Sequence, residues 1–184
     1  WQVLEWKMNI PVGFRTSSGI THIHPLKGQE GTNIGSPVIT ISLRGSNDGT
    51  GRRIEVIHTG RAGSTSQGKI VDNTTEYSLD KFEGEWLQVQ QETNYKRHGY
   101  YRIRITRIRD NAVLMDYTNN DIDIWRDGGC INVRNKFGIY RSYGSTMGTA
   151  EDRPTNGIKD ENLWLADFKV YEKNTNSNPE AVND

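Results

Sequence analysis

The sequence predicts an all-β fold in which two antiparallel sheets pack face to face as a jelly roll. Many short runs are rich in Val, Ile, Thr, Tyr and Trp, and few stretches have the periodicity of a helix. Nineteen glycines, together with Asn, Asp and Ser, separate these runs as turn signals. The length of 184 residues, of which 25% are charged, fits one soluble globular domain.

The expected strands follow one another along the chain, and in each of them β-branched or aromatic residues recur. Turn signals lie between several of them: SNDGTG after the third, RDNA after the sixth, NNDID after the seventh and RDGG before the eighth. This spacing favours antiparallel pairing. The nine runs cover residues 3–10, 20–26, 37–44, 52–59, 85–95, 100–108, 112–118, 130–142 and 163–172.

Two long polar stretches, 60–80 and 144–161, do not fit the strand pattern. We interpret them as candidate binding loops or as plain surface connections, and the residues favour neither. Residues 174–184 form a polar tail that we expect to fray. One domain is therefore expected over residues 1–173, followed by this tail.

The charge balance excludes some classes of partner. With 23 basic and 23 acidic residues there is no overall field that would hold nucleic acid, so an anionic ligand must be met by local clusters. No apolar run approaches the roughly 18 to 20 residues of a membrane span, so no membrane partner is expected. Cys130 is the single cysteine, which excludes an internal disulfide. We expect a monomer.

Alternation in the eighth run divides its side chains between two faces. The column that we expect to face the core comprises Ile131, Val133, Asn135, Phe137 and Ile139. The column that we expect on the outer face comprises Cys130, Asn132, Arg134, Lys136, Gly138 and Tyr140. The outer column carries two cations and a phenol, and at its glycine a ligand has room to approach the backbone.

Other runs repeat this division into an apolar and a polar column. The polar columns contain His22 and His24 in the second run, Arg44 in the third, and Gln88 and Gln90 in the fifth. We interpret them as one sheet face whose side chains suit sugar hydroxyls and carboxylates. An ordinary solvated face is the better interpretation for most of these positions, but a binding role is favoured for the two histidines and for the tyrosine of KFGIY.

Two of these strands resemble those of a known enzyme family. The run HIH near the start and the run KFGIY near the end are similar to the Q-I-H and K-A-G-V-Y strands of jelly-roll polysaccharide lyases, which include alginate, heparin, glucuronan and ulvan lyases. The phrases THIHPLKG, DIWRDGG, KFGIYRS and LADFKVYE occur in the order of that family, and the resemblance covers about residues 1–173. It implies a concanavalin-like sandwich with a concave glycan-binding face. It also implies β-elimination of a 4-linked uronic acid polysaccharide, which leaves an unsaturated sugar at the new non-reducing end.

The resemblance implies roles for individual residues. His24 matches the histidine of Q-I-H and would be the base or part of the group that neutralises the substrate carboxylate, while Tyr140 matches the tyrosine that acts as acid or as both acid and base. Lys136 matches the family's lysine and would contact a sugar carboxylate. His22 stands where the family has glutamine, so neutralisation would need its N–H or its protonated form. Further substrate contacts are expected from Arg44, Arg134, Gln88 and Gln90.

Two other classes of protein share a sandwich fold. Glycoside hydrolases of the laminarinase type need paired carboxylates on one strand, as in E-x-D-x-E, and the sequence has no such run. A non-catalytic carbohydrate-binding module or lectin remains the alternative, because the same face would hold a glycan without cutting it.

The resemblance also bears on cofactors, partners and location. The elimination requires no cofactor, and His22 and His24 lack a third ligand for a metal site. Calcium is left open, because some relatives bind it. The implied partner is an acidic polysaccharide, and the implied location is secreted or periplasmic. The family's arginine-rich strand, R-S-E-L-R, has no counterpart before Trp1, which leaves open whether N-terminal strands of the domain are missing.

Overall fold

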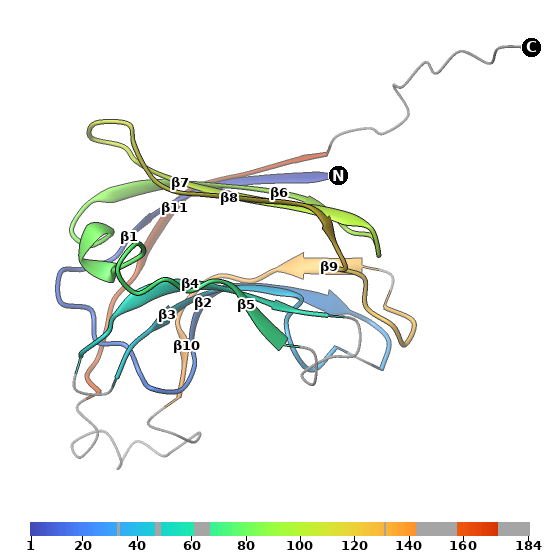
Figure 1. Cartoon of the computed structure of the whole chain (residues 1–184), viewed down its shortest axis with the longest axis horizontal. Helices are drawn as coiled ribbons and strands as arrows, with labels where there is room; N and C mark the ends of the chain where they lie inside the picture. The colour runs from blue at the N-terminus through green and yellow to red at the C-terminus, as the bar shows by residue number, and fades with distance from the viewer. Residues whose placement is uncertain (33, 47–48, 61–66, 131, 143–157, 173–184) are drawn as a thin grey trace, which may run out of the picture.

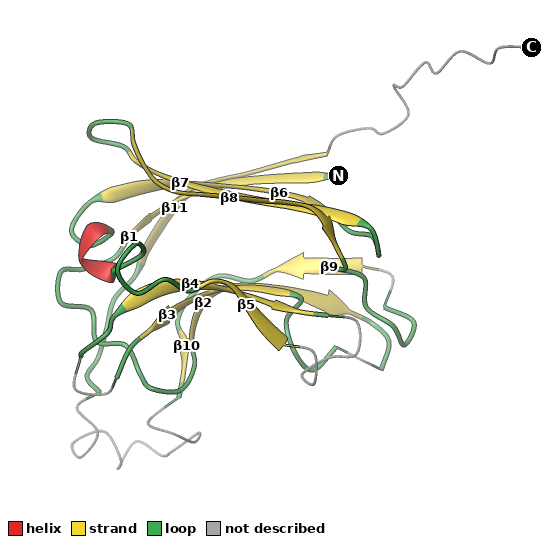
Figure 2. Ribbon diagram, in the orientation of Figure 1, coloured by secondary structure: helices red, strands yellow, loops and turns green. Residues whose placement is uncertain are grey.

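The computed structural model is a sandwich of two antiparallel sheets (Figures 1 and 2), and it describes residues 1–32, 34–46, 49–60, 67–130, 132–142 and 158–172. The first sheet has the order β11-β1-β6-β7-β8 and contains β1 (Gln2–Asn9), β6 (Trp86–Asn94), β7 (Gly99–Arg107), β8 (Ala112–Ile122) and β11 (Trp164–Glu172). The second sheet has the order β10-β2-β3-β4-β5 and contains β10 (Tyr140–Arg141), β2 (Thr21–Gln29), β3 (Ile39–Arg44), β4 (Arg53–Thr59) and β5 (Gln67–Val71). A further strand, β9 (Asn132–Asn135), also pairs with β2. The all-β, two-sheet prediction is confirmed.

The core lies between the sheets and follows the alternation of the strands. In β6, for example, Leu87 and Val89 are fully buried, whereas Gln88 between them points outward. Trp6 of β1 is the largest of the fully buried side chains. Burying each aliphatic side chain of this core, such as Leu87, contributes about 1.5–3 kcal/mol. This shared core fixes the two sheets against each other and leaves the outer face of the second sheet available to a ligand.

Two of the sequence predictions fail locally. The stretch 60–80 was expected to be irregular, but it contains β5 and a short 3-10 helix, Leu79–Lys81. Burial explains the difference, because Val71 and Leu79 both join the core. The eighth run does not continue as one strand, because Gly138 has a φ of 120° and separates β9 from β10.

Three further expectations fall wholly or partly outside the described residues. They concern residues 61–66 of the first polar stretch, residues 143–157, which include most of the second, and the tail 174–184. Within the described ranges, no helix reaches the length and hydropathy that crossing a bilayer requires.

Candidate active site

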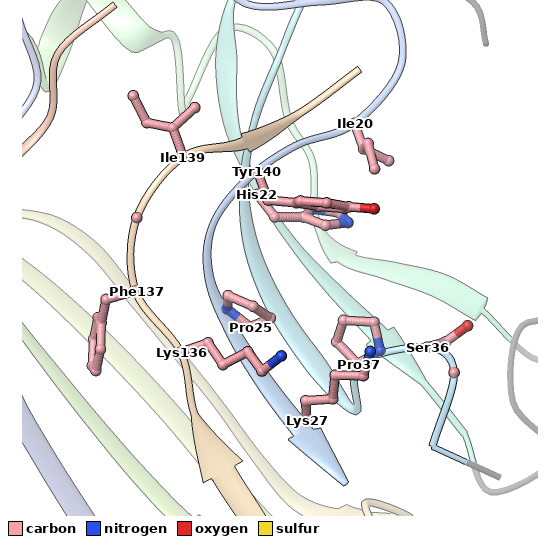
Figure 3. A pocket seen from close by; sticks show the side chains of 12 residues that line it. Ile20, His22, Pro25, Lys27, Ser36, Pro37, Lys136, Phe137, Ile139 and Tyr140 are labelled. Carbon is pink, nitrogen blue, oxygen red and sulfur yellow. The ribbon is translucent and has the colours of Figure 1, made fainter. Parts of the chain in front are cut away.

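An open groove of about 550 Å³ lies on the outer face of the second sheet (Figure 3). Its walls are β2, the loop before β3 and the segment that joins β9 to β10. We define the groove by its polar side chains, which are His22, Lys27, Ser36, Lys136 and Tyr140. The groove therefore combines two ammonium groups, an imidazole and a phenol.

Tyr140 and His22 form one side of the groove. They are directly opposite each other in the pairing of β10 with β2, so their side chains lie on the same face. The ring centroids are 6.3 Å apart and the ring planes differ by 24°. Figure 3 shows one ring over the other, with the phenol oxygen and an imidazole nitrogen on the same side. The phenol is exposed, since Tyr140 has 55% of its surface accessible.

A hydrogen-bond chain determines the tautomer of His22. The hydroxyl of Ser42 donates to the carbonyl oxygen of Thr21 at 3.0 Å, which uses its single proton. With the proton used in this way, the contact of the hydroxyl with Nδ1 of His22, at 3.1 Å, is one in which Nδ1 donates. Nε2 is then left with a free lone pair in the neutral ring.

The charge state of His22 agrees with this tautomer. Burial, with a smaller contribution from the positive charge of Arg44, lowers the pKa of His22 to about 4. The ring is therefore neutral near pH 7. Because its N–H is held by Ser42, His22 does not suit the neutralisation of a carboxylate, which the sequence suggested. Its Nε2 has a lone pair for a proton, and the lowered pKa makes it a weak base in the free protein.

His24 does not face the groove. A bulge in the pairing of β2 with β3, between His22 and His24, reverses the alternation, so the expectation that the two histidines share a column is wrong. His24 is 1% exposed and packs between Trp6 and Phe137, with ring centroids 5.6 Å and 4.7 Å away. Its Nδ1 is 3.2 Å from the amide nitrogen of Gln91, and burial lowers its pKa to about 4. In this position the imidazole contributes to the core and is separated from any ligand in the groove.

Positive charge gathers at the other end of the groove. Lys27 is opposite Arg134 in the pairing of β2 with β9, and Lys136 follows two residues later on the same face. Figure 3 shows the side chains of Lys27 and Lys136 reaching toward the same part of the groove. Burial lowers the pKa of Lys27, and repulsion from Lys136 and Arg134 adds to the effect. This end of the groove therefore favours an anion.

Lys27 is a groove residue that the sequence pattern did not predict. Strict alternation counted from His22 would assign Lys27 to the inner column, and the bulge returns it to the outer face. Pro25 was the available signal, because a proline inside a strand often marks a bulge.

Two predicted substrate contacts lie on the wrong sheet. Gln88 and Gln90 belong to β6, so they point outward from the first sheet, away from the groove. Their side-chain amides are engaged there: Gln88 donates to the carbonyl of Trp6 at 3.1 Å, and Gln90 donates to the carboxylate of Glu5 at 2.9 Å. The prediction failed because the polar columns of the two sheets look alike in sequence.

The columns expected for the eighth run are correct in its middle and wrong at its ends. Arg134 and Lys136 are exposed, and Phe137 packs inward against Trp6, as expected. Cys130 was expected outside but is 1% exposed, and Ile139 was expected in the core but is 36% exposed and lines the groove. The turn at Gly138, directly before Ile139, explains why Ile139 is exposed.

Arg44 lies beside the groove rather than in it. It pairs with the buried carboxylate of Glu55, with its Nε 3.3 Å from Oε2, and lines a second hollow. No group of three His, Cys, Asp or Glu side chains that would hold a metal ion is found among the described residues. The expectation about calcium stays a prediction.

Sequence comparisons give no match, either to a family model or to a curated protein. Structural comparison identifies the fold as the jelly roll of polysaccharide lyases. Similar structures include an endo-β-1,4-glucuronan lyase from the fungus Trichoderma reesei, with a TM-score of 0.58 and 11% identity, covering 92% of this chain and 67% of the other. An alginate lyase from a Chlorella virus has a TM-score of 0.58 and 9% identity, covering 94% and 71%. An alginate lyase from Aplysia kurodai has a TM-score of 0.52 and 13% identity, covering 94% and 69%. At these identities the likeness establishes the fold alone.

Proposed function

We propose that this chain is a polysaccharide lyase that cleaves a 4-linked, uronic-acid-containing polysaccharide by β-elimination. The observation that carries the proposal is the stacked pair of Tyr140 and neutral His22, placed beside a cluster of cations in an open groove. The fold supports it, since the similar structures named above are lyases of glucuronan and alginate.

The arrangement suggests a division of labour. Lys136 and Lys27 would hold the carboxylate of the sugar, which makes the proton on the neighbouring carbon, C5, more acidic. Nε2 of His22 would accept that proton, and the electrons of the C–H bond would form the C4–C5 double bond. The bond from C4 to the glycosidic oxygen would break as the phenol of Tyr140 donates its proton to that oxygen. A proton passed from the imidazolium to the phenolate, directly or through water, would restore both groups.

A non-catalytic carbohydrate-binding module is the second candidate. The position of His24 favours it, because the groove then holds one imidazole where the sequence suggested two. The same cations and the same exposed ring would still bind an acidic glycan.

An absorbance assay separates the two candidates. The unsaturated product of a lyase absorbs in the near ultraviolet, so the protein is mixed with alginate, glucuronan, ulvan and heparin in turn. A rise in absorbance with any of them supports the lyase and identifies its substrate. Binding without a rise supports the binding module. Dialysis against EDTA before the assay, followed by the return of calcium, tests the expectation about that ion.

Replacing Lys136 with glutamine is expected to raise KM roughly 10- to 150-fold, because an ammonium contact to a carboxylate is worth roughly 1.5–3 kcal/mol. Steady-state kinetics on the substrate from the absorbance assay measure the change. Lys169→Gln is the matched control, since this lysine lies on β11 of the first sheet and is exposed. An unchanged KM for Lys136→Gln would remove the lysine from the site.

A further inference from the structure

A second hollow adjoins the groove on the same sheet and is built around a buried carboxylate. It measures about 380 Å³, and the residues that line it include Ser18, Arg44, Arg53, Glu55 and Lys69. From its charge and its position we infer that it is a second anion-binding subsite, which holds another acidic group of the same polysaccharide. The inference rests on the proposed function for the identity of its ligand.

The charges in this hollow do not balance. Glu55 is 0% exposed and is contacted by Arg44 at 3.3 Å, by Lys69 at 2.8 Å and by Arg53. Three cations around one carboxylate leave a formal excess of two positive charges among these four side chains. Such an excess favours the binding of an anion.

The donors are also incompletely used. Nε of Arg53 is buried and has no hydrogen-bond partner among the described residues. The side chain of Lys69 is 43% exposed while its ammonium group pairs with Glu55. The partly exposed Lys69 can turn part of its donor capacity toward a carboxylate or a sulfate without breaking the sheet.

The pairing of the strands shows that the two hollows lie on the same face of the second sheet. Tyr140 is opposite His22, His22 is opposite Ser42, and Ser42 is opposite Glu55, so these four side chains form a row across the outer face. Neighbouring strands are about 4.8 Å apart, which places Glu55 about 14 Å from Tyr140. A separation of that size exceeds one sugar ring, so the second subsite would engage a different residue of the chain.

Arg44 belongs to the second hollow and lies on β3, the strand next to that of His22. It contacts Glu55 on one side, and on the other its charge helps to lower the pKa of His22. A polysaccharide lying along this row would therefore meet positive charge from the groove to β5. A monomeric acidic sugar would occupy only one of the two subsites.

Two opposite substitutions test the inference by isothermal titration in a Tyr140→Phe background, which slows turnover. Lys69→Gln is expected to weaken the binding of alginate and of inorganic sulfate roughly tenfold, because one charged donor is lost. Glu55→Gln is expected to tighten binding of both several-fold, because the internal competitor for the three cations is removed. Heparin in place of alginate shows whether sulfate groups are preferred to carboxylates.

Thermal unfolding of each variant serves as the structural control. If the cluster is only an ion-pair network, both substitutions change the unfolding temperature and neither changes affinity, and the inference is overturned. Lys69→Gln decides alone if Glu55→Gln does not fold, since Lys69 is partly exposed on an edge strand. Sulfate binding that depends on Lys69 in a protein without lyase activity would support the subsite and reject the enzyme. Lyase activity together with unchanged binding in Lys69→Gln would reject the subsite and support the enzyme.

Discussion

Replacing Tyr140 with phenylalanine is expected to lower kcat by roughly 10²- to 10⁴-fold, the usual contribution of a positioned acid or base. The substitution removes one hydroxyl from an exposed side chain, so the ring still stacks on His22 and the fold is retained. The initial rate of the absorbance change on the identified substrate measures the effect. KM is expected to change little, because the lysines of the groove remain in place.

The control for this substitution is Tyr171→Phe, which removes a phenol of similar exposure from β11 on the first sheet. It should leave kcat unchanged. Titration of Tyr140→Phe with the intact polysaccharide should still show binding. Full turnover by Tyr140→Phe would exclude the phenol from the chemistry.

The second large expected effect is a loss of folding stability at acid pH. His22 and His24 both have their pKa lowered from 6.5 to about 4, chiefly by burial. As pH falls below 6.5, the unfolded chain binds protons that the folded chain refuses, so stability is lost between about pH 6.5 and pH 4. A shift of this size corresponds to about 3 kcal/mol for each histidine. Urea unfolding at pH 7 and at pH 4 is expected to show that loss in addition to the effect of the carboxylates.

Replacing His24 tests whether this histidine causes part of the loss of stability. His24→Gln replaces the buried imidazole with an amide that can still accept a hydrogen bond from Gln91, so the loss from pH 7 to pH 4 should shrink by about 3 kcal/mol. His98→Gln is the control, because that side chain is 90% exposed. The same pH dependence in His24→Gln and in the unmodified protein would contradict the assignment.

The alternation of apolar and polar residues predicted most of the fold, because in a strand it reflects which side chains are buried. Residues such as Leu87 and Val89 alternate with polar neighbours, and a strand with one buried face accepts only one register. The same signal predicted that Arg134 and Lys136 face outward. It does not say which of two sheets a strand joins, and for this reason Gln88 and Gln90 were assigned to the wrong surface.

The candidate site was harder to predict because it lies where alternation fails. The bulge in β2 inserts one residue and turns His24 into the core, while the glycine turn brings Ile139 and Tyr140 out together. Both departures depend on backbone conformation, which residue chemistry alone indicates weakly. Pro25 and Gly138 were the visible markers, since each is unusual inside a strand.

The shortness of β10 has a consequence for the lifetime of the proposed activity. This strand has two residues and, within the described ranges, pairs with β2, whereas the strands of the first sheet run for eight to eleven residues. Short pairings open at a lower free energy than the whole domain unfolds. The phenol is therefore attached to a part of the sandwich that we expect to open before the whole domain unfolds. Heat inactivation should begin several degrees before the sheets themselves come apart.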